Sequence, residues 1–150
     1  MLTIELFPHA TEETRAIRTR VFIEEQGFVT PQEEFDAYDD GGTHLLARWN
    51  EEPAGTGRMI FEENAAPGHA KLGRIAVLPQ FRRHPARVGA HVLAGLVEEA
   101  RKAGVRVLYL SAQCQAQPFY ERCGFTARGP VYDENGIPHV YMELTISVDS

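Results

Sequence analysis

Residues 77–90 join an apolar strand to an amphipathic helix, and they read Val77-Leu78-Pro79-Gln80-Phe81-Arg82-Arg83-His84-Pro85-Ala86-Arg87-Val88-Gly89-Ala90. Apolar side chains recur at helical spacing from Val88 to Ala100, and Gly104 follows as an exit signal. A further apolar stretch at 105–110 predicts the next strand. Strand, helix and strand therefore follow one another at a length that fits a right-handed parallel crossover, the centre of an α/β fold.

The junction between this strand and this helix has the properties of an anion-binding site. The first amides of a helix have no partner inside the helix, and the helix dipole adds positive potential there. Arg82, Arg83 and Arg87 increase that potential, and a guanidinium group matches phosphate oxygens with its planar fork. A solvated basic turn before a helix is the alternative interpretation of the same residues.

The whole pattern predicts a single mixed α/β domain over residues 1–150 with a mostly antiparallel sheet. Apolar runs and their flanking turn residues predict strands at 2–6, 43–49, 55–61, 70–78, 105–110, 125–131 and 140–146. Helices are expected at 12–26, 88–102 and 118–124, and an acidic loop at 28–42. Hairpin turns are expected at residues 50–53 and around Asn135-Gly136.

The composition excludes several classes of protein. A hydrophobic content of 43% is typical of a globular domain and too high for a disordered chain. A formal net charge of -6 argues against a nucleic-acid surface, which needs clustered, uncompensated Lys and Arg. No segment has the pattern of a signal sequence or the apolar length of a membrane span, so we expect no membrane association and a cytoplasmic location. The two cysteines and six histidines lack ligand spacing, so no metal is expected.

Several motifs, taken in order, resemble one enzyme family. The strand, arginine-containing turn, apolar helix and second strand, followed by Gln113 and residues 118–125, are similar to the acetyl-CoA core of the GNAT N-acetyltransferases. The motifs that resemble its ElaA/YjcF-like branch are Arg20-Val21-Phe22-Ile23-Glu24-Glu25-Gln26, Thr43-His44-Leu45-Leu46, Leu110-Ser111-Ala112-Gln113 and Gly136-Ile137-Pro138-His139. The resemblance covers nearly the whole chain. It implies the GNAT fold, whose parallel middle strands, here 70–78 and 105–110, splay apart to hold the pantetheine arm between flanking helices.

The resemblance also implies that acetyl-CoA is a co-substrate. In the family, a Gln/Arg-x-x-Gly-x-Gly/Ala pattern supplies backbone amides around the CoA diphosphate. Residues 84–89 match this pattern with two departures, because His84 stands at the leading Gln/Arg and Arg87 at the first glycine, while Gly89 is kept. Arg87 either weakens CoA binding through its bulk or clamps the phosphates. The implied cofactor residues are Ile75, Ala76, Val77, Arg82, Arg83, Arg87, Val88, Gly89, Ala90, Phe119 and Tyr120.

Tyr120 occupies the position at which the resemblance implies a general acid for the departing CoA thiolate. A phenol is protonated at neutral pH and can donate to a developing thiolate, which suits that role. The alternative is an aromatic residue that packs in the core, as expected for Phe119. Carbonyl polarisation is expected from a backbone amide near Val77.

Four residues of the branch motifs are candidates for the acceptor site: Glu25, Gln26, Gln113 and His139. A carboxylate or an imidazole there can take a proton from an incoming ammonium. Structural roles are the alternative, such as an ion pair of Glu25 at a helix end. The acidic loop at 33–40 either attracts a cationic acceptor or forms a solvated surface.

These observations predict an N-acetyltransferase that passes the acetyl group of acetyl-CoA to a primary amine by direct attack in a ternary complex. An acyl-CoA-binding sensor of the same fold, with little or no turnover, is the main alternative, and the altered position of Arg87 supports it. A hydrolase with Cys114 as nucleophile and His139 or His44 as base is a weaker alternative. A homodimer is expected from base rates alone.

Overall fold

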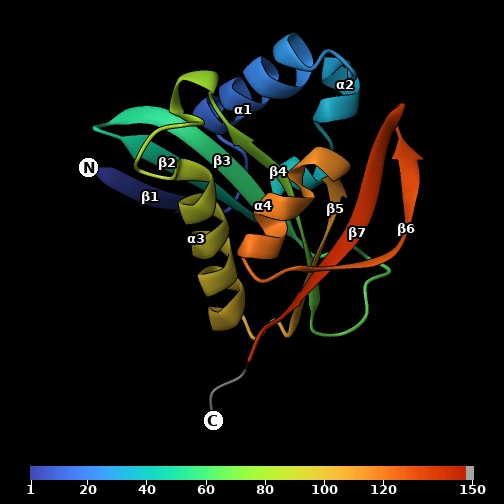
Figure 1. Cartoon of the computed structure of the whole chain (residues 1–150). Helices are drawn as coiled ribbons and strands as arrows, with labels where there is room; N and C mark the ends of the chain where they lie inside the picture. Colours follow the sequence, from blue (N-terminus) through green and yellow to red (C-terminus); the bar gives the residue numbers. More distant parts are fainter. Residues whose placement is uncertain (148–150) are drawn as a thin grey trace.

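The computed structural model describes residues 1–147 as one mixed sheet with helices on both faces (Figure 1). Its strands are β1 (Leu2–Phe7), β2 (Thr43–Trp49), β3 (Glu52–Ile60), β4 (His69–Val77), β5 (Val107–Gln113), β6 (Thr126–Glu134) and β7 (Ile137–Thr145). Its α-helices are α1 (Glu12–Arg18), α2 (Pro31–Glu34), α3 (Val88–Lys102) and α4 (Gln117–Arg122). A π-helix, η1 (Thr19–Glu25), follows α1, and the 3-10 helices are η2 (Ala37–Asp40), η3 (Pro79–Phe81) and η4 (Cys114–Ala116). Within residues 1–147, no helix has both the length and the apolar character needed to cross a membrane.

The sheet contains one parallel pair, and that pair separates after three residues. The strand order is β1-β2-β3-β4-β5-β7-β6, and only β4 and β5 run parallel. Residues 69–71 of β4 pair with residues 107–109 of β5. Beyond this point β4 pairs only with β3, and β5 only with β7. The expected mixed, mostly antiparallel sheet with splayed parallel middle strands is therefore confirmed.

A β-bulge bends β4 shortly after its last pairing with β5 at Lys71. Arg74 and Ile75 of β4 lie opposite the single residue Gly57 of β3, and Arg74 has a left-handed φ of 53°. Ile75 folds over Gly57, where a Cβ atom would lie 2.6 Å from Ile75 Cδ1. The bulge therefore needs a residue without a side chain at position 57.

Both faces of the central strands are buried. Leu45 and Leu46 are neighbours in β2, so they point to opposite faces, yet neither is exposed to solvent. On one face α3 packs with Val92 and Leu96, and on the other α1 packs with Ile17. Figure 1 shows α3 crossing the sheet while α1 and α2 lie together beyond the far ends of β4 and β5. This leaves room for α4 beside α3, over the place where the two strands separate.

The first helix differs from the continuous α-helix expected at 12–26. α1 ends at Arg18, and the wider turns of η1 continue to Glu25, with the N–H of Gln26 donating to the carbonyl of Val21 at 3.0 Å. An apolar pattern cannot separate α from π turns because both continue one helical path. The wider turns rotate the side chains that follow, which changes the face presented by residues such as Gln26.

Both hairpins are tighter than expected. Asn50 and Glu51 alone connect β2 to β3, with φ of 48° and 75°, so β3 begins at residue 52 rather than 55. Asn135 and Gly136 connect β6 to β7 in the same way, with φ of 55° and 79°. A two-residue turn leaves no loop, so β6 and β7 extend to the turn itself. β5 also begins two residues later than expected and continues to residue 113 because it pairs with β7 along its length.

The segment 28–42 is only partly the solvated acidic surface that its composition indicated, since Glu33, Asp36 and Asp40 are exposed but two other carboxylates are buried. It folds as α2 and η2, and its Glu34 and Asp39 are 3% and 1% exposed. Arg18 of α1 donates from Nε to Oε2 of Glu34 at 2.9 Å and from Nη1 to Oδ1 of Asp39 at 2.5 Å. Arg58 of β3 also donates to Oδ1 of Asp39, at 3.0 Å. These carboxylates are therefore bound inside the protein rather than offered to an acceptor.

The same ion network reaches the bulge in β4. Nε of Arg74 lies 2.9 Å from Oε2 of Glu34, and Arg58 donates to Asp36 at 2.8 and 2.9 Å. Three arginines thus face three carboxylates, namely Glu34, Asp36 and Asp39. Buried charges are tolerated only when they are paired in this way. The network fixes α2 and η2 to β3 and β4.

We predict that Asp39→Asn destabilises the protein by about 3–5 kcal/mol at neutral pH, because Arg18 and Arg58 would keep buried charges without their shared partner. Urea unfolding followed by circular dichroism measures this change. Asp40→Asn is the matched control, since Asp40 is exposed and forms no ion pair within residues 1–147. We expect the control to change stability by less than about 0.5 kcal/mol. Equal unfolding midpoints for the two variants would contradict a structural role for the network.

The stability contributed by Asp39 also has a defined pH dependence. Burial alone would raise the pKa of Asp39, but the hydrogen bonds from Arg18 and from the backbone of Asp36, together with the charges of Arg18 and Arg58, outweigh it and lower the pKa from its ordinary 3.8 to about 2. The contribution is therefore complete above pH 3.8 and is lost as the pH falls towards 2. Urea titrations over this range should show the wild type and Asp39→Asn converging. A constant difference would contradict the ionised state of Asp39.

Candidate acyl-CoA cleft and acceptor groove

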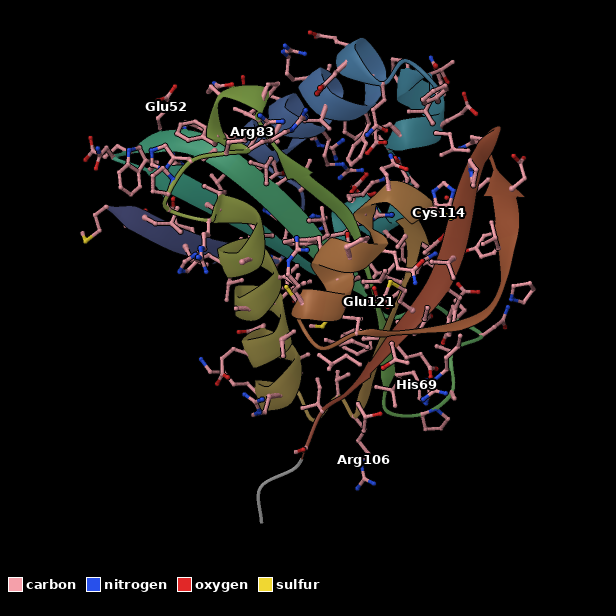
Figure 2. All side chains as sticks on the ribbon, in the orientation of Figure 1. Glu52, His69, Arg83, Arg106, Cys114 and Glu121 are labelled. Carbon is pink, nitrogen blue, oxygen red and sulfur yellow. The ribbon has the colours of Figure 1, made fainter. Side chains whose placement is uncertain are left out.

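A cleft of about 750 Å³ opens where β4 and β5 have separated. Figure 2 marks the two ends of this region, with His69 and Arg106 at the paired end and Cys114 at the open end. The cleft is bounded by the end of β4, the start of α3, η1 and α4. All predicted cofactor residues except Arg83 line it, namely Ile75, Ala76, Val77, Arg82, Arg87, Val88, Gly89, Ala90, Phe119 and Tyr120.

The start of α3 presents three unused backbone donors to the cleft. The turn before the helix satisfies its own amides, since the N–H of Ala86 donates to His84 Nδ1 and that of Arg87 to the His84 carbonyl. The first bonded amide of the helix is that of His91. Among the described residues, the amides at 88–90 have no acceptor, and this end of a helix favours an anion.

Arg87 stands at the entry to α3 in a left-handed conformation, with φ 53° and ψ 56°. Glycine adopts this conformation without steric cost, whereas other residues lose roughly 1–2 kcal/mol. The left-handed backbone therefore explains why the family pattern has a glycine at this position. The side chain of Arg87 is exposed at the mouth of the cleft, so its charge adds to the positive end of the helix.

Arg82 and Arg83 differ in their surroundings. Arg82 forms a double hydrogen bond to the carboxylate of Glu25 and donates from Nε to the Val77 carbonyl at 2.9 Å. This pairing raises the pKa of Arg82 and lowers the pKa of Glu25. Arg83 lies outside the lining of the cleft, on the loop before α3 (Figure 2). Arg82 therefore ties η1 to the end of β4, and a contact of either arginine with phosphate stays a prediction.

A second cavity of about 710 Å³, the acceptor groove, adjoins the cleft. It extends between α2, β4, β5 and the β6–β7 hairpin and contains three of the four predicted acceptor residues, Gln26, Gln113 and His139. The fourth, Glu25, lies beside the groove in its pair with Arg82. Residues that line both cavities are Phe22, Gln26, Ile75, Arg82, Ala116 and Tyr120.

Tyr120 lies at the boundary between the cleft and the groove. Its ring packs edge-on against Phe119 and Phe125, with centroid distances of 5.1 and 5.9 Å. Burial raises the pKa of Tyr120 to about 12, so its hydroxyl is protonated throughout the physiological range. Within residues 1–147 that hydroxyl has no hydrogen-bond partner, which leaves it free to donate into the cavities.

Beside its predicted residues, the groove contains Glu134, which the sequence did not single out. Gln26 accepts from Nε2 of Gln113 at 3.2 Å, which joins the end of η1 to β5. His139 faces Glu134 across the hairpin. Glu134 was missed because its register with His139 depends on the exact turn, although Asn135-Gly136 was the available signal.

The residues of the hydrolase alternative do not meet. Cys114 lines neither cavity, and His44 is 1% exposed and bound through Nε2 to the Gly41 carbonyl at 2.7 Å. His139 does line the groove. In the part of the chain that the structure describes, no three His, Cys, Asp or Glu side chains gather as metal ligands.

Comparison with known proteins identifies the family. The family model described as "Acetyltransferase (GNAT) domain" matches residues 10–146. The chain is 37% identical to the Bacillus subtilis protein YyaT over 139 residues, which covers 90% of this chain and 88% of YyaT. It is 34% identical to the B. subtilis N-acetyltransferase YjcF over 127 residues, which covers 84% of this chain and 86% of YjcF.

Solved structures agree with this family. The crystal structure of Escherichia coli ElaA has a TM-score of 0.82 and 25% identity, covering 96% of this chain and 99% of ElaA. A B. subtilis acetyltransferase solved in complex with CoA has a TM-score of 0.72 and 19% identity, and the match covers 98% of this chain and 100% of that protein. At that identity the second likeness concerns the fold alone.

We predict that Arg87→Gly is more stable than Arg87→Ala by about 1 kcal/mol. Both variants lose the charge, but only glycine adopts the left-handed backbone freely. Urea unfolding of the two variants isolates the backbone effect from the loss of the side chain. Equal stability would contradict a left-handed residue at the entry to α3.

Proposed function

This chain belongs to the GNAT acetyltransferase family, and we propose that it transfers the acetyl group of acetyl-CoA to a primary amine by direct attack in a ternary complex. Membership establishes acyl transfer from an acyl-CoA. The acetyl donor and the amine acceptor are the proposal. The observation that carries it is the meeting of cleft and groove at Tyr120. This geometry supports a thioester in the cleft and an acceptor in the groove.

The cleft offers matching groups to an acyl-CoA. The free amides at 88–90 and the charge of Arg87 suit the diphosphate of an acyl-CoA. A B. subtilis acetyltransferase with this fold was solved in complex with CoA. The N–H of Leu78 donates to Ala54 in β3 at 2.9 Å. Because N–H directions alternate along a strand, the N–H of Val77 points away from β3, towards the side that β5 has left. This amide is the donor we assign to the thioester carbonyl.

The proposed reaction needs no covalent enzyme intermediate. A neutral amine from the groove attacks the carbonyl carbon, and the developing oxyanion is stabilised by the Val77 amide. Tyr120 then protonates the departing thiolate, a role supported by its raised pKa and its free hydroxyl. As the C–S bond breaks, the Val77 amide therefore stabilises the charge on the carbonyl oxygen, and Tyr120 neutralises the charge on sulfur.

The alternative function is an acyl-CoA sensor, and two residues near the start of α3 support it. A strained, bulky residue at the phosphate end and Pro85, which lacks an N–H, are the features that favour it. A sensor would bind acetyl-CoA without releasing CoA in the presence of amines. The two functions differ in turnover and not in binding.

We predict that the wild type binds acetyl-CoA by calorimetry and releases free CoA thiol with at least one member of a panel of primary amines. Tyr120→Phe should bind acetyl-CoA as the wild type does but lose about 10²–10⁴-fold in kcat, because the acid is absent. Tyr38→Phe is the matched control, since Tyr38 lines neither cavity. Binding with no turnover on any amine would favour the sensor, and unchanged kcat in Tyr120→Phe would remove the acid.

A further inference from the structure

His139 is a buried imidazole in the wall of the acceptor groove. It is 6% exposed and pairs in register with Gln113 of β5, at the end where β4 and β5 are splayed. It lines the same cavity as Tyr120. An imidazole in this place is the kind of group that can exchange a proton with an acceptor at physiological pH.

The hydrogen bonding of the ring defines which nitrogen is the base. Nδ1 of His139 lies 2.8 Å from the carbonyl oxygen of Ile137, and a carbonyl can only accept, so Nδ1 carries the hydrogen. The lone pair of the neutral ring is then on Nε2. That atom lies 3.4 Å from Oε2 of Glu134 in β6. A proton that arrives at Nε2 would form an imidazolium beside a carboxylate.

The elements around the ring support this arrangement. The ring of Tyr132 stacks on that of His139 at 6.2 Å, and the hydroxyl of Ser111 lies 3.4 Å from Oε1 of Glu134. Glu134 is thus held from β5 as well as by its own strand. The polar and titratable groups on the strands beside this ring are Tyr132 and Glu134 of β6, Ser111 and Gln113 of β5, and Tyr141 of β7.

The other carboxylates near the groove are already engaged. Glu34 is bound to Arg18 and Arg74, and Glu25 to Arg82. The cations Lys71, Arg74 and Arg82 cannot accept a proton. Glu33 lies in α2, where its Oε1 accepts from the backbone N–H of Thr30 at 3.0 Å and caps its own helix. This leaves the pair of His139 and Glu134.

We propose that His139 is the base that takes a proton from the acceptor ammonium, and that Glu134 is a positioning residue that stabilises the imidazolium. This assignment rests on the proposed N-acetyl transfer. An N–H bond of the ammonium breaks and its proton forms an N–H bond at Nε2. The neutral amine attacks the carbonyl carbon, the C–S bond breaks, and Tyr120 gives its proton to sulfur. The attacking nitrogen returns a proton to Tyr120, and His139 releases one proton to water per amide formed.

His139→Asn tests the base, because asparagine can still donate to the Ile137 carbonyl but cannot take the proton. The acceptors are the most active primary alkylamine of the wild-type screen, which is an ammonium at neutral pH, and methoxyamine, which is largely uncharged. We expect kcat/KM to fall by about 10²-fold or more for the alkylamine and by less than about fivefold for methoxyamine. A purely structural role would lower both rates together, so equal losses overturn the proposal.

Glu134→Gln tests the positioning role. The loss of the carboxylate should lower kcat/KM severalfold more for the alkylamine than for methoxyamine, because the imidazolium that forms at Nε2 loses the neighbouring negative charge. Glu121→Gln is the matched control, because Glu121 lies on α4 outside both cavities (Figure 2). Equal changes in kcat/KM for the two amines in Glu134→Gln overturn the role of Glu134.

Two further measurements separate the possible failures. Calorimetric binding of acetyl-CoA to each variant reports whether the fold and the cleft are intact. If the wild type releases no CoA with either amine, the proposed function fails before the base is tested. If the wild type turns over and Glu33→Gln reproduces the selective loss while His139→Asn does not, the base is Glu33 and the proposal is overturned.

Discussion

The ion pair between Arg74 and Glu34 fixes the bulge of β4 to α2, next to the place where β4 separates from β5. The parallel pairing ends at Lys71, and the bulge at Arg74 and Ile75 follows after two further residues. A bulge bends its strand and increases the local twist, which turns β4 away from β5. The left-handed backbone at Arg74 is unfavourable on its own, so the contacts of its guanidinium group with Glu34 stabilise it. The contact therefore stabilises the bend of β4 next to the point at which β4 and β5 separate.

The frame of the fold could be predicted from local patterns in the sequence. The apolar spacing from Val88 to Ala100 and the glycine at 104 define α3 within a residue of its observed ends, and the strand before and after it follow. The ends of the strands differed from the prediction. The turn Asn50-Glu51 needs two positive φ values but contains no glycine, so the sequence did not mark it as a two-residue turn. The order of the motifs then allowed the family, and with it the splayed strands, to be identified.

The ion network could not be predicted, because its partners are far apart in the chain. Arg18 of α1 binds Asp39, which lies 21 residues later in the chain, and Arg58 binds the same carboxylate from β3. In the sequence these residues look like ordinary surface charges, since burial of an ion depends on tertiary packing alone. The same reason hid the pairing of Arg82 with Glu25, which lies 57 residues earlier in the chain.

The acceptor side shows how a turn can carry functional information. Because Asn135 and Gly136 form the whole connection, the register of β6 and β7 is fixed, and His139 must lie opposite Tyr132. Glu134, two residues beyond Tyr132, then projects from the same face of β6 and reaches the imidazole. A loop longer by one residue would place Glu134 on the other face. The chemistry proposed for the groove therefore depends on a backbone conformation as much as on the residues that face it.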